Sequence, residues 1–249
     1  MKYNELTFQG RNAVLEAFRS GKTIDKLFIL DGCQDGPVKS IVREARKTDV
    51  IINYVDKERL DRLAGTGHHQ GVVAIGAAYE YAEVDDILDA ARNKGEAPFI
   101  FILDEIEDPH NLGSIIRSAV CAGAHGVIIP RRRAASVTAA ATKASAGAIE
   151  YAHVAKVANI ANAIARLKDE GLWIAGADMS GTAMASARMD GALALVIGSE
   201  GDGISRLVKE KCDFLVSIPM FGPIDSLNAS VAAAILMFEK RRQDGIKKG

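Results

Sequence analysis

The fold class follows from residues 99–130, FIFILDEIEDPHNLGSIIRSAVCAGAHGVIIP. A short apolar run (99–106), a segment of helical spacing (111–123) and a second apolar run (126–130) succeed one another, which predicts strand, helix and strand. The same alternation continues with a helix at 136–148, a strand at 153–157, a helix at 159–171, strands at 172–178 and 192–198, a helix at 203–212, a strand at 214–220 and a helix at 226–242. This pattern predicts an α/β fold with a parallel sheet covered on both faces.

The residues before this region predict a smaller α/β unit. Its expected elements are a helix at 12–19, a strand at 27–30, a helix at 38–47, a strand at 50–55, a helix at 57–65 and a closing strand at 71–79. We therefore expect a domain at 1–79, a linker with a short polar helix at 80–97, and a second domain at 98–249. Sequence patterns alone predict an open, unknotted sheet, because threaded chains are very rare.

Composition describes an ordinary globular protein of 249 residues, with 48% hydrophobic and 25% charged residues. A net charge of −1 gives no overall attraction to nucleic acid, so any affinity for nucleic acid must come from local basic patches. Cys33, Cys121 and Cys212 are odd in number and far apart, which argues against a disulfide framework and a zinc site. The first residues have no signal-peptide pattern and no apolar run approaches the ~18 residues that span a bilayer, so we expect a cytoplasmic protein.

Three segments place polar residues and glycines between an apolar run and a helical pattern. They are DPHNLGSIIRSA (108–119), ALALVIGSEGDGIS (192–205) and IPMFGPIDSLNASVAAAI (218–235). Such joints at the carboxyl ends of strands are where α/β folds bind small molecules, so the sequence predicts an enzyme. The glycine loop GSEGDG (198–203) reverses the glycine order of a dinucleotide fingerprint, which makes a Rossmann dehydrogenase a poor match.

Each of these residues also has a purely structural interpretation. The glycine loop can be a tight turn, Asn111 and Ser226 can be helix caps, and Arg117 can be a solvated charge. Arg131 to Arg133, which follow a predicted strand, can bind nucleic-acid phosphate or form a solvated loop, and Lys143 can assist them or only stabilise its helix. His68 and His69 lack a third ligand at suitable spacing, so no metal is predicted.

Two further expectations concern the last helix. Leu227, Val231, Ile235 and Phe238 fall near one helical stripe. The cations at 240–242 are expected to lie on an exposed helix end, where they complement the helix dipole.

The three segments, together with KASAGAIE (143–150), resemble the motifs of the SpoU or TrmH-like branch of the SPOUT methyltransferases, which transfer a methyl group from S-adenosylmethionine to a ribose 2'-hydroxyl of RNA. The resemblance extends over Phe99–Glu239 and implies a trefoil knot in which the last helix passes through an earlier loop. It also implies a homodimer whose active sites form along its interface. The N-terminal region is more weakly similar to the L30e-like RNA-binding extension of the large-subunit ribosomal RNA guanosine methyltransferases.

The resemblance also implies functional residues. The implied catalytic cluster is Asn111, Arg117, Glu200, Ser226 and Asn228. The implied cofactor-binding residues are Gly198, Glu200, Gly201, Ile218, Met220 and Leu227. The candidate RNA contacts are Arg131, Arg132, Arg133 and Lys143. The family assigns proton removal to the arginine at position 117, but guanidinium is a poor base and a good phosphate clamp, so both roles stay open.

The substrate implied is ribosomal RNA, most specifically a guanosine in the peptidyl-transferase region of 23S ribosomal RNA, with a uridine or cytidine as open alternatives. Transfer RNA is an alternative, because transfer-RNA relatives share all three motifs. A protein of another class, an RNA-binding assembly factor with a silent methyl-transfer site, is the second alternative.

Overall fold

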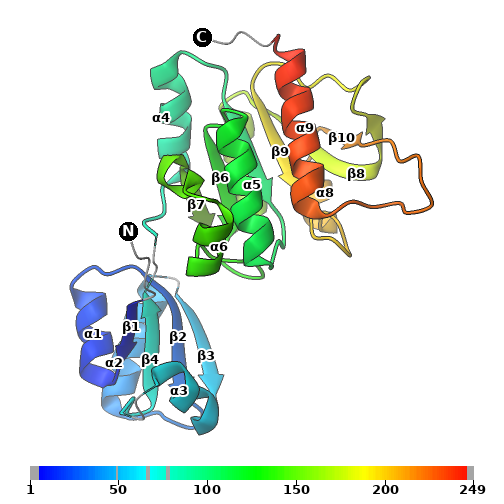
Figure 1. Cartoon of the computed structure of the whole chain (residues 1–249). Coiled ribbons are helices and arrows are strands. Elements are labelled where there is room, and N and C mark those ends of the chain that lie inside the picture. The colour runs from blue at the N-terminus through cyan, green and yellow to red at the C-terminus, as the bar shows by residue number, and fades with distance from the viewer. Residues whose placement is uncertain (1–5, 49, 66–67, 77–78, 246–249) are drawn as a thin grey trace. The chain divides into compact units, whose positions relative to one another are not determined.

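A computed structural model describes residues 6–48, 50–65, 68–76 and 79–245. The chain divides into two compact units, residues 1–80 and 81–249 (Figure 1).

The smaller unit contains a four-stranded mixed sheet with the strand order β1-β4-β2-β3. Its elements are β1 (Leu6–Gln9), α1 (Arg11–Arg19), β2 (Ile24–Leu30), α2 (Gly36–Lys47), β3 (Ile51–Val55), α3 (Lys57–Ala64) and β4 (Val72–Gly76). β2 and β3 are parallel, whereas β4 runs antiparallel to β1 and β2. The predicted closing strand reaches only Gly76, and positions 77 and 78 lie outside the described residues.

Helices cover both faces of this sheet because the side chains of β2 alternate. Leu27 and Ile29 are buried in a cluster with residues of α1 and α2. Phe28 points to the opposite face and packs with Leu60 of α3. Aspartates 35 and 56 cap α2 and α3, so each helix begins where the sequence supplies an N-cap acceptor.

The larger unit contains a six-stranded, all-parallel sheet with the order β10-β8-β9-β5-β6-β7. Its elements are α4 (Val84–Lys94), β5 (Phe99–Leu103), α5 (Pro109–Cys121), β6 (Gly126–Pro130), α6 (Ala139–Ala144), the 3₁₀ helix η1 (Ala148–Tyr151), β7 (Val154–Val157), α7 (Ile160–Asp169), β8 (Trp173–Ala183), β9 (Leu193–Ile197), α8 (Arg206–Lys209), β10 (Phe214–Ser217) and α9 (Ala229–Gln243). The predicted α/β class and parallel sheet are confirmed.

Both faces of the central strand β5 are buried. Ile100 and Ile102 belong to a core cluster with residues of α4, α7 and α8. Phe99 lies on the opposite face, where the ammonium of Lys240 on α9 sits 5.0 Å from its ring centroid. Helices α5 and α9 pack side by side (Figure 1). A strand covered on two faces explains why FIFIL is continuously apolar.

The predicted linker at 80–97 contains α4. Ile87, Leu88 and Ala91 of this helix are buried in the same core cluster as β5 or at its edge. The polar surface of α4 suggested a connecting segment, yet its apolar stripe packs against the larger unit.

Two predicted helices are shorter in the structure. The helix expected at 136–148 is divided into α6 and η1, because Ala146 and Gly147 adopt positive φ angles of 49° and 88°. The helix expected at 203–212 is reduced to α8, which spans Arg206–Lys209.

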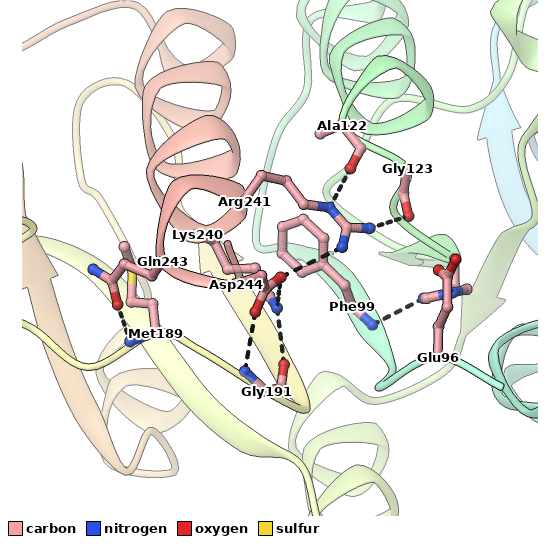
Figure 2. Close-up of polar contacts among 11 residues, drawn as sticks. Glu96, Phe99, Ala122, Gly123, Met189, Gly191, Lys240, Arg241, Gln243 and Asp244 are labelled. Carbon is pink, nitrogen blue, oxygen red and sulfur yellow. Dashed lines mark hydrogen bonds and ion pairs between the residues drawn. The ribbon is translucent and has the colours of Figure 1, made fainter. Parts of the chain in front are cut away.

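The expectation of an exposed helix end at 240–242 is wrong for Lys240. Its side chain is 1% exposed, and its ammonium donates to the carbonyl of Gly191 at 2.9 Å and contacts Asp244 (Figure 2). The neighbouring Arg241 donates to the carbonyl oxygens of Ala122 and Gly123, which follow α5. These bonds join the end of α9 to two distant segments.

The predicted apolar stripe of the last helix is not its buried face. The buried residues of α9 are Ala229, Ala233, Leu236, Met237 and Lys240. Val231 and Phe238 are 46% and 52% exposed, and Leu227 precedes the helix. The prediction failed because α9 is apolar on two sides, and a helical period alone does not select the side that meets the sheet.

Candidate active site

The middle of β8, the joints after β9 and β10, and the start of α9 line one cavity. This glycine-loop cavity has a volume of about 340 Å³. Its walls come from residues 177–179, 197–203, 216–218, 220 and 225–227, with further contributions from α9. All six predicted cofactor-binding residues line it: Gly198, Glu200, Gly201, Ile218, Met220 and Leu227.

The glycine loop is held in shape by its own backbone. Ser199 N donates to Gly203 O at 3.0 Å and Gly203 N donates to Ser199 O at 3.1 Å. A Cβ at Gly198 would lie 2.0 Å from the carbonyl carbon of Gly203, so only glycine fits there. Gly201 has open space around its Cα. Gly198 is therefore required by the turn itself, and Gly201 leaves room beside the cavity.

A polar cluster connects the start of α5, the glycine loop and the start of α9. Oε1 of Glu200 accepts hydrogen bonds from Nδ2 of Asn111 at 2.9 Å, from Nδ2 of Asn228 and from the backbone N–H of Ala229 at 3.4 Å. Nδ2 of Asn228 also lies 2.9 Å from Oδ1 of Asn111. The structure thus brings together three of the five predicted catalytic residues from positions that lie far apart in the chain.

The helix caps differ from the structural interpretations of Asn111 and Ser226. Asp108 is the N-cap of α5, and its Oδ1 accepts from His110 N at 2.9 Å. Asn228, not Ser226, is the N-cap of α9. Oδ1 of Asn228 accepts from Ser230 N at 2.9 Å while its amide nitrogen reaches Glu200, so one side chain caps the helix and completes the cluster.

A second cavity shares the glycine loop and is acidic. This acidic cavity, about 350 Å³ in volume, is lined by Glu105, Ile106, Glu107, Asp108, Asn111 and residues 199–202. Sequence analysis missed this concentration of carboxylates, although Glu105, Glu107 and Asp108 all follow β5 directly. The polar cluster lies where the two cavities meet, since Glu200 lines both.

Asp178 is a further residue of the glycine-loop cavity that sequence analysis missed. Partial burial opposes its ionisation, but hydrogen bonds from Lys209 Nζ at 2.7 Å and from Ser180 outweigh this and hold the pKa of Asp178 below its usual value. An ionised carboxylate in the cavity wall can accept hydrogen bonds from a ligand's hydroxyl or amino groups. Asp178 ends the strand predicted at 172–178, and this position at the carboxyl end of a strand could have identified it as a site residue.

Arg117 and Ser226 lie apart from the hydrogen-bonded cluster. Arg117 is exposed on α5, and among the described residues its guanidinium makes no hydrogen bond or ion pair. Ser226 is exposed in the glycine-loop cavity wall. Both side chains are therefore available to a ligand.

The candidate RNA contacts have different environments. Arg131 lies 3.4 Å from the carbonyl oxygen of Lys156, and Arg133 forms an ion pair with Glu105 at 3.1 Å. Arg132 and Lys143 are exposed. Arg133 thereby borders the acidic cavity through Glu105.

Neither a metal centre nor a membrane-spanning helix is found in the part of the chain that the structure describes. No three histidine, cysteine or carboxylate side chains there lie close enough to hold a metal ion. No helix there has the length and apolar composition needed to cross a bilayer.

The glycine-loop cavity suits a nucleoside-sized molecule. Its volume lies within the range of about 300–1,000 Å³ that is typical of small-molecule sites. Ile218, Met220 and Leu227, which are only partly buried, offer apolar surface for a flat ring, and Asp178 offers a carboxylate for hydroxyl groups. The fold and site define an α/β enzyme that binds a small polar cofactor beside a carboxylate–amide cluster.

Comparison with known proteins identifies the family. Residues 98–238 match the model of the SpoU rRNA Methylase family, and residues 9–82 match that of RNA 2'-O ribose methyltransferase substrate-binding domains. The chain belongs to the SpoU family of RNA methyltransferases.

Individual relatives agree with this assignment. YacO of Bacillus subtilis (strain 168), which is named as a TrmH family tRNA/rRNA methyltransferase, is 51% identical over 241 residues and covers 94% of each chain. A Staphylococcus haemolyticus (strain JCSC1435) protein with the same family name is 46% identical over 245 residues, covering 97% of this chain and 98% of its own. The solved structure of the SpoU methyltransferase AviRb from Streptomyces viridochromogenes with AdoMet is similar at a TM-score of 0.61 and 25% identity, covering 96% of this chain and 90% of that one.

Proposed function

We propose that this protein transfers the methyl group of S-adenosylmethionine to a ribose 2'-hydroxyl of ribosomal RNA, with a guanosine in the peptidyl-transferase region of 23S ribosomal RNA as the target. The observation that carries the proposal is the Asn111–Glu200–Asn228 cluster at the edge of the glycine-loop cavity. The family assignment and the AdoMet-bound AviRb structure support the cofactor. Bacterial relatives make the cytoplasm the expected compartment.

When bound, S-adenosylmethionine supplies a methyl group that its sulfonium already activates, so the protein must chiefly align the two reactants. Gly198, Gly201, Ile218, Met220 and Leu227 hold the cofactor by shape and by backbone groups. Glu200 fixes the amides of Asn111 and Asn228, whose positions orient the ribose. Ser226, exposed at the same wall, hydrogen-bonds the reacting nucleotide.

Arg117 acts on the RNA side of the reaction, because its guanidinium is exposed. Two roles remain distinct hypotheses: proton abstraction from the 2'-hydroxyl, or clamping of a phosphate while Glu200 or water receives the proton. Single-turnover pH–rate profiles of wild type and Arg117→Lys separate them. A shift of the limb on which the rate rises with pH, which reports the base, indicates abstraction, and a uniform loss of rate indicates clamping. Unchanged chemistry in the variant contradicts both.

RNA capture involves both units in this proposal. Residues 1–79 form the RNA-binding domain, 98–249 form the methyltransferase domain, and Arg131, Arg132, Arg133 and Lys143 contact RNA phosphate near the site. We further propose that α9 is threaded in the trefoil knot of the family. The chain also acts as a homodimer, which the exposed apolar Val231 and Phe238 of α9 support.

Methyl transfer from tritiated S-adenosylmethionine to unmodified ribosomal and transfer RNA transcripts tests the proposal. We expect incorporation into 23S ribosomal RNA, located by mapping ribose methylation in a deletion strain. Incorporation into transfer RNA alone would favour a transfer-RNA methyltransferase, an activity that the tRNA/rRNA names of the relatives also include. RNA binding without incorporation into either would favour an assembly factor.

A further inference from the structure

The smaller unit carries a basic stripe that the predicted site does not include. Lys39, Arg43, Arg46 and Lys47 recur on α2 at positions i, i+4, i+7 and i+8, and all four are exposed. This spacing places them along one face of the helix. They border a groove of about 660 Å³, which we call the α2 groove.

The charges of the stripe are only partly neutralised. Glu44 lies 3.0 Å from Lys47 and 3.8 Å from Arg43. Among the described residues, Lys39 and Arg46 form no ion pair. Four cations around one carboxylate leave a local excess of positive charge, although the whole chain carries a net charge of only −1.

The floor and far wall of the groove are apolar and aromatic. Val38 and Val42 of α2 and Cys33 line it beside the basic stripe. Tyr54 lines it from β3, the edge strand of the sheet, and is 55% exposed. An exposed ring with cations around it is the combination with which proteins bind unpaired nucleotides, because bases stack on the ring while cations grip the phosphates.

We infer that the α2 groove binds an unpaired segment of the RNA substrate, with a base stacked on Tyr54 and phosphates held by the basic stripe. This inference rests on the proposed function, which supplies RNA as the ligand. The rise of a helix places Lys39 and Lys47 about 12 Å apart along the axis, a length that admits more than one phosphate. A duplex is disfavoured because its bases are already stacked on one another. An acidic protein partner would match the cations but leave the exposed ring unexplained.

Binding of the full chain to a fluorescent single-stranded RNA that contains the methylated sequence tests the inference, with the same sequence in a duplex as the comparison. We expect Arg43→Ala/Arg46→Ala to weaken binding at least about tenfold and to reduce the salt slope by about 1.4, since each lost phosphate contact removes about 0.7. Tyr54→Ala should weaken binding about tenfold without changing the salt slope, and Tyr54→Phe should bind like wild type. The matched control is Lys57→Ala/Arg59→Ala, which removes two exposed cations of α3.

The outcomes separate this inference from the proposed function. If wild type methylates RNA but the groove variants bind like the α3 control, the inference is wrong and the proposed function stands. If wild type binds RNA through the groove but methylates none, the proposed function fails alone. Equal binding of duplex and single strand by wild type would overturn the inference in favour of recognition of RNA shape.

Discussion

Oε1 of Glu200 is the single acceptor on which the polar cluster depends. Three donors from α5 and the start of α9 converge on it: Asn111, Asn228 and Ala229. Glu200 and Asn111 are 89 residues apart in the chain. The family resemblance nominated both side chains, whereas residue type and position alone favoured a helix cap for Asn111 and did not single out Glu200. Their hydrogen bond could not be predicted from local patterns, because it depends on how two loops meet at the sheet edge.

Replacing Glu200 with alanine should lower the single-turnover rate of methyl transfer about 100-fold, because both amides lose the acceptor that orients them. Glu200→Gln should retain more activity than the alanine variant, since it keeps an oxygen acceptor. The control is Glu210→Ala, which removes an exposed carboxylate at the end of α8. A wild-type rate in Glu200→Ala would show that the cluster is not part of the catalytic machinery.

The buried His125 should make the free energy of unfolding depend on pH. Burial lowers the pKa of His125, whose Nδ1 accepts from Phe99 N at 3.0 Å and whose Nε2 lies 3.1 Å from Glu96. The unfolded chain therefore binds the proton more readily than the folded one. This contribution to stability is present above about pH 6.5 and is lost as the pH falls from about 6.5 through the lower pKa of the folded state.

Urea unfolding at a series of pH values tests this prediction. The free energy of unfolding of wild type should fall more steeply below about pH 6.5 than that of His125→Asn, whose amide oxygen can still accept from Phe99. His153→Asn, at an exposed position, should follow wild type. Identical slopes for wild type and His125→Asn would show that His125 does not couple folding to protonation.

The packing of α5 against α6 depends on a glycine that the sequence pattern did not single out. A Cβ at Gly113 would lie 2.3 Å from the carbonyl oxygen of Ala141 and 2.7 Å from Cβ of Ala144. Glycine inside a helix is ordinarily unfavourable, so its presence in α5 has a packing reason. The helix itself was predictable from its apolar spacing, but the neighbour that requires Gly113 was not.

Gly113→Ala should lower the free energy of unfolding by about 1–3 kcal/mol, because the added methyl group forces α5 and α6 apart. Gly36→Ala in α2, where nothing lies within 4 Å of the added atom, should leave stability unchanged or slightly higher. Urea denaturation of both variants measures the difference. Equal stability of the two variants would contradict the close approach of α5 and α6.

At the scale of the whole molecule, helix α9 shows what the sequence could and could not predict. Alternating apolar runs and helical patterns were sufficient to predict the parallel sheet and most of its helices. They did not distinguish the inner face of α9, which includes Leu236 and the buried Lys240, from the outer face with Val231 and Phe238. Both faces are apolar at helical spacing, and only the partners differ: the sheet on one side and, as we propose, a second copy on the other.

Val231→Glu/Phe238→Glu should therefore convert a dimer into a monomer, because two charges would be buried in the interface. Leu207→Glu, which alters an exposed apolar residue of α8, should leave the dimer intact. Sedimentation velocity at matched concentrations distinguishes the two states. A wild-type chain that is monomeric throughout, or a double variant that still dimerises, would contradict an interface on α9.

A crystal structure of the full chain with S-adenosylmethionine is the decisive measurement for the site. We predict that the nucleoside lies among the glycine loop, Ile218 and Leu227, with its methyl carbon facing the cluster formed by Asn111, Glu200 and Asn228. A nucleoside bound elsewhere, or one whose methyl carbon is turned away from Glu200, would contradict the account.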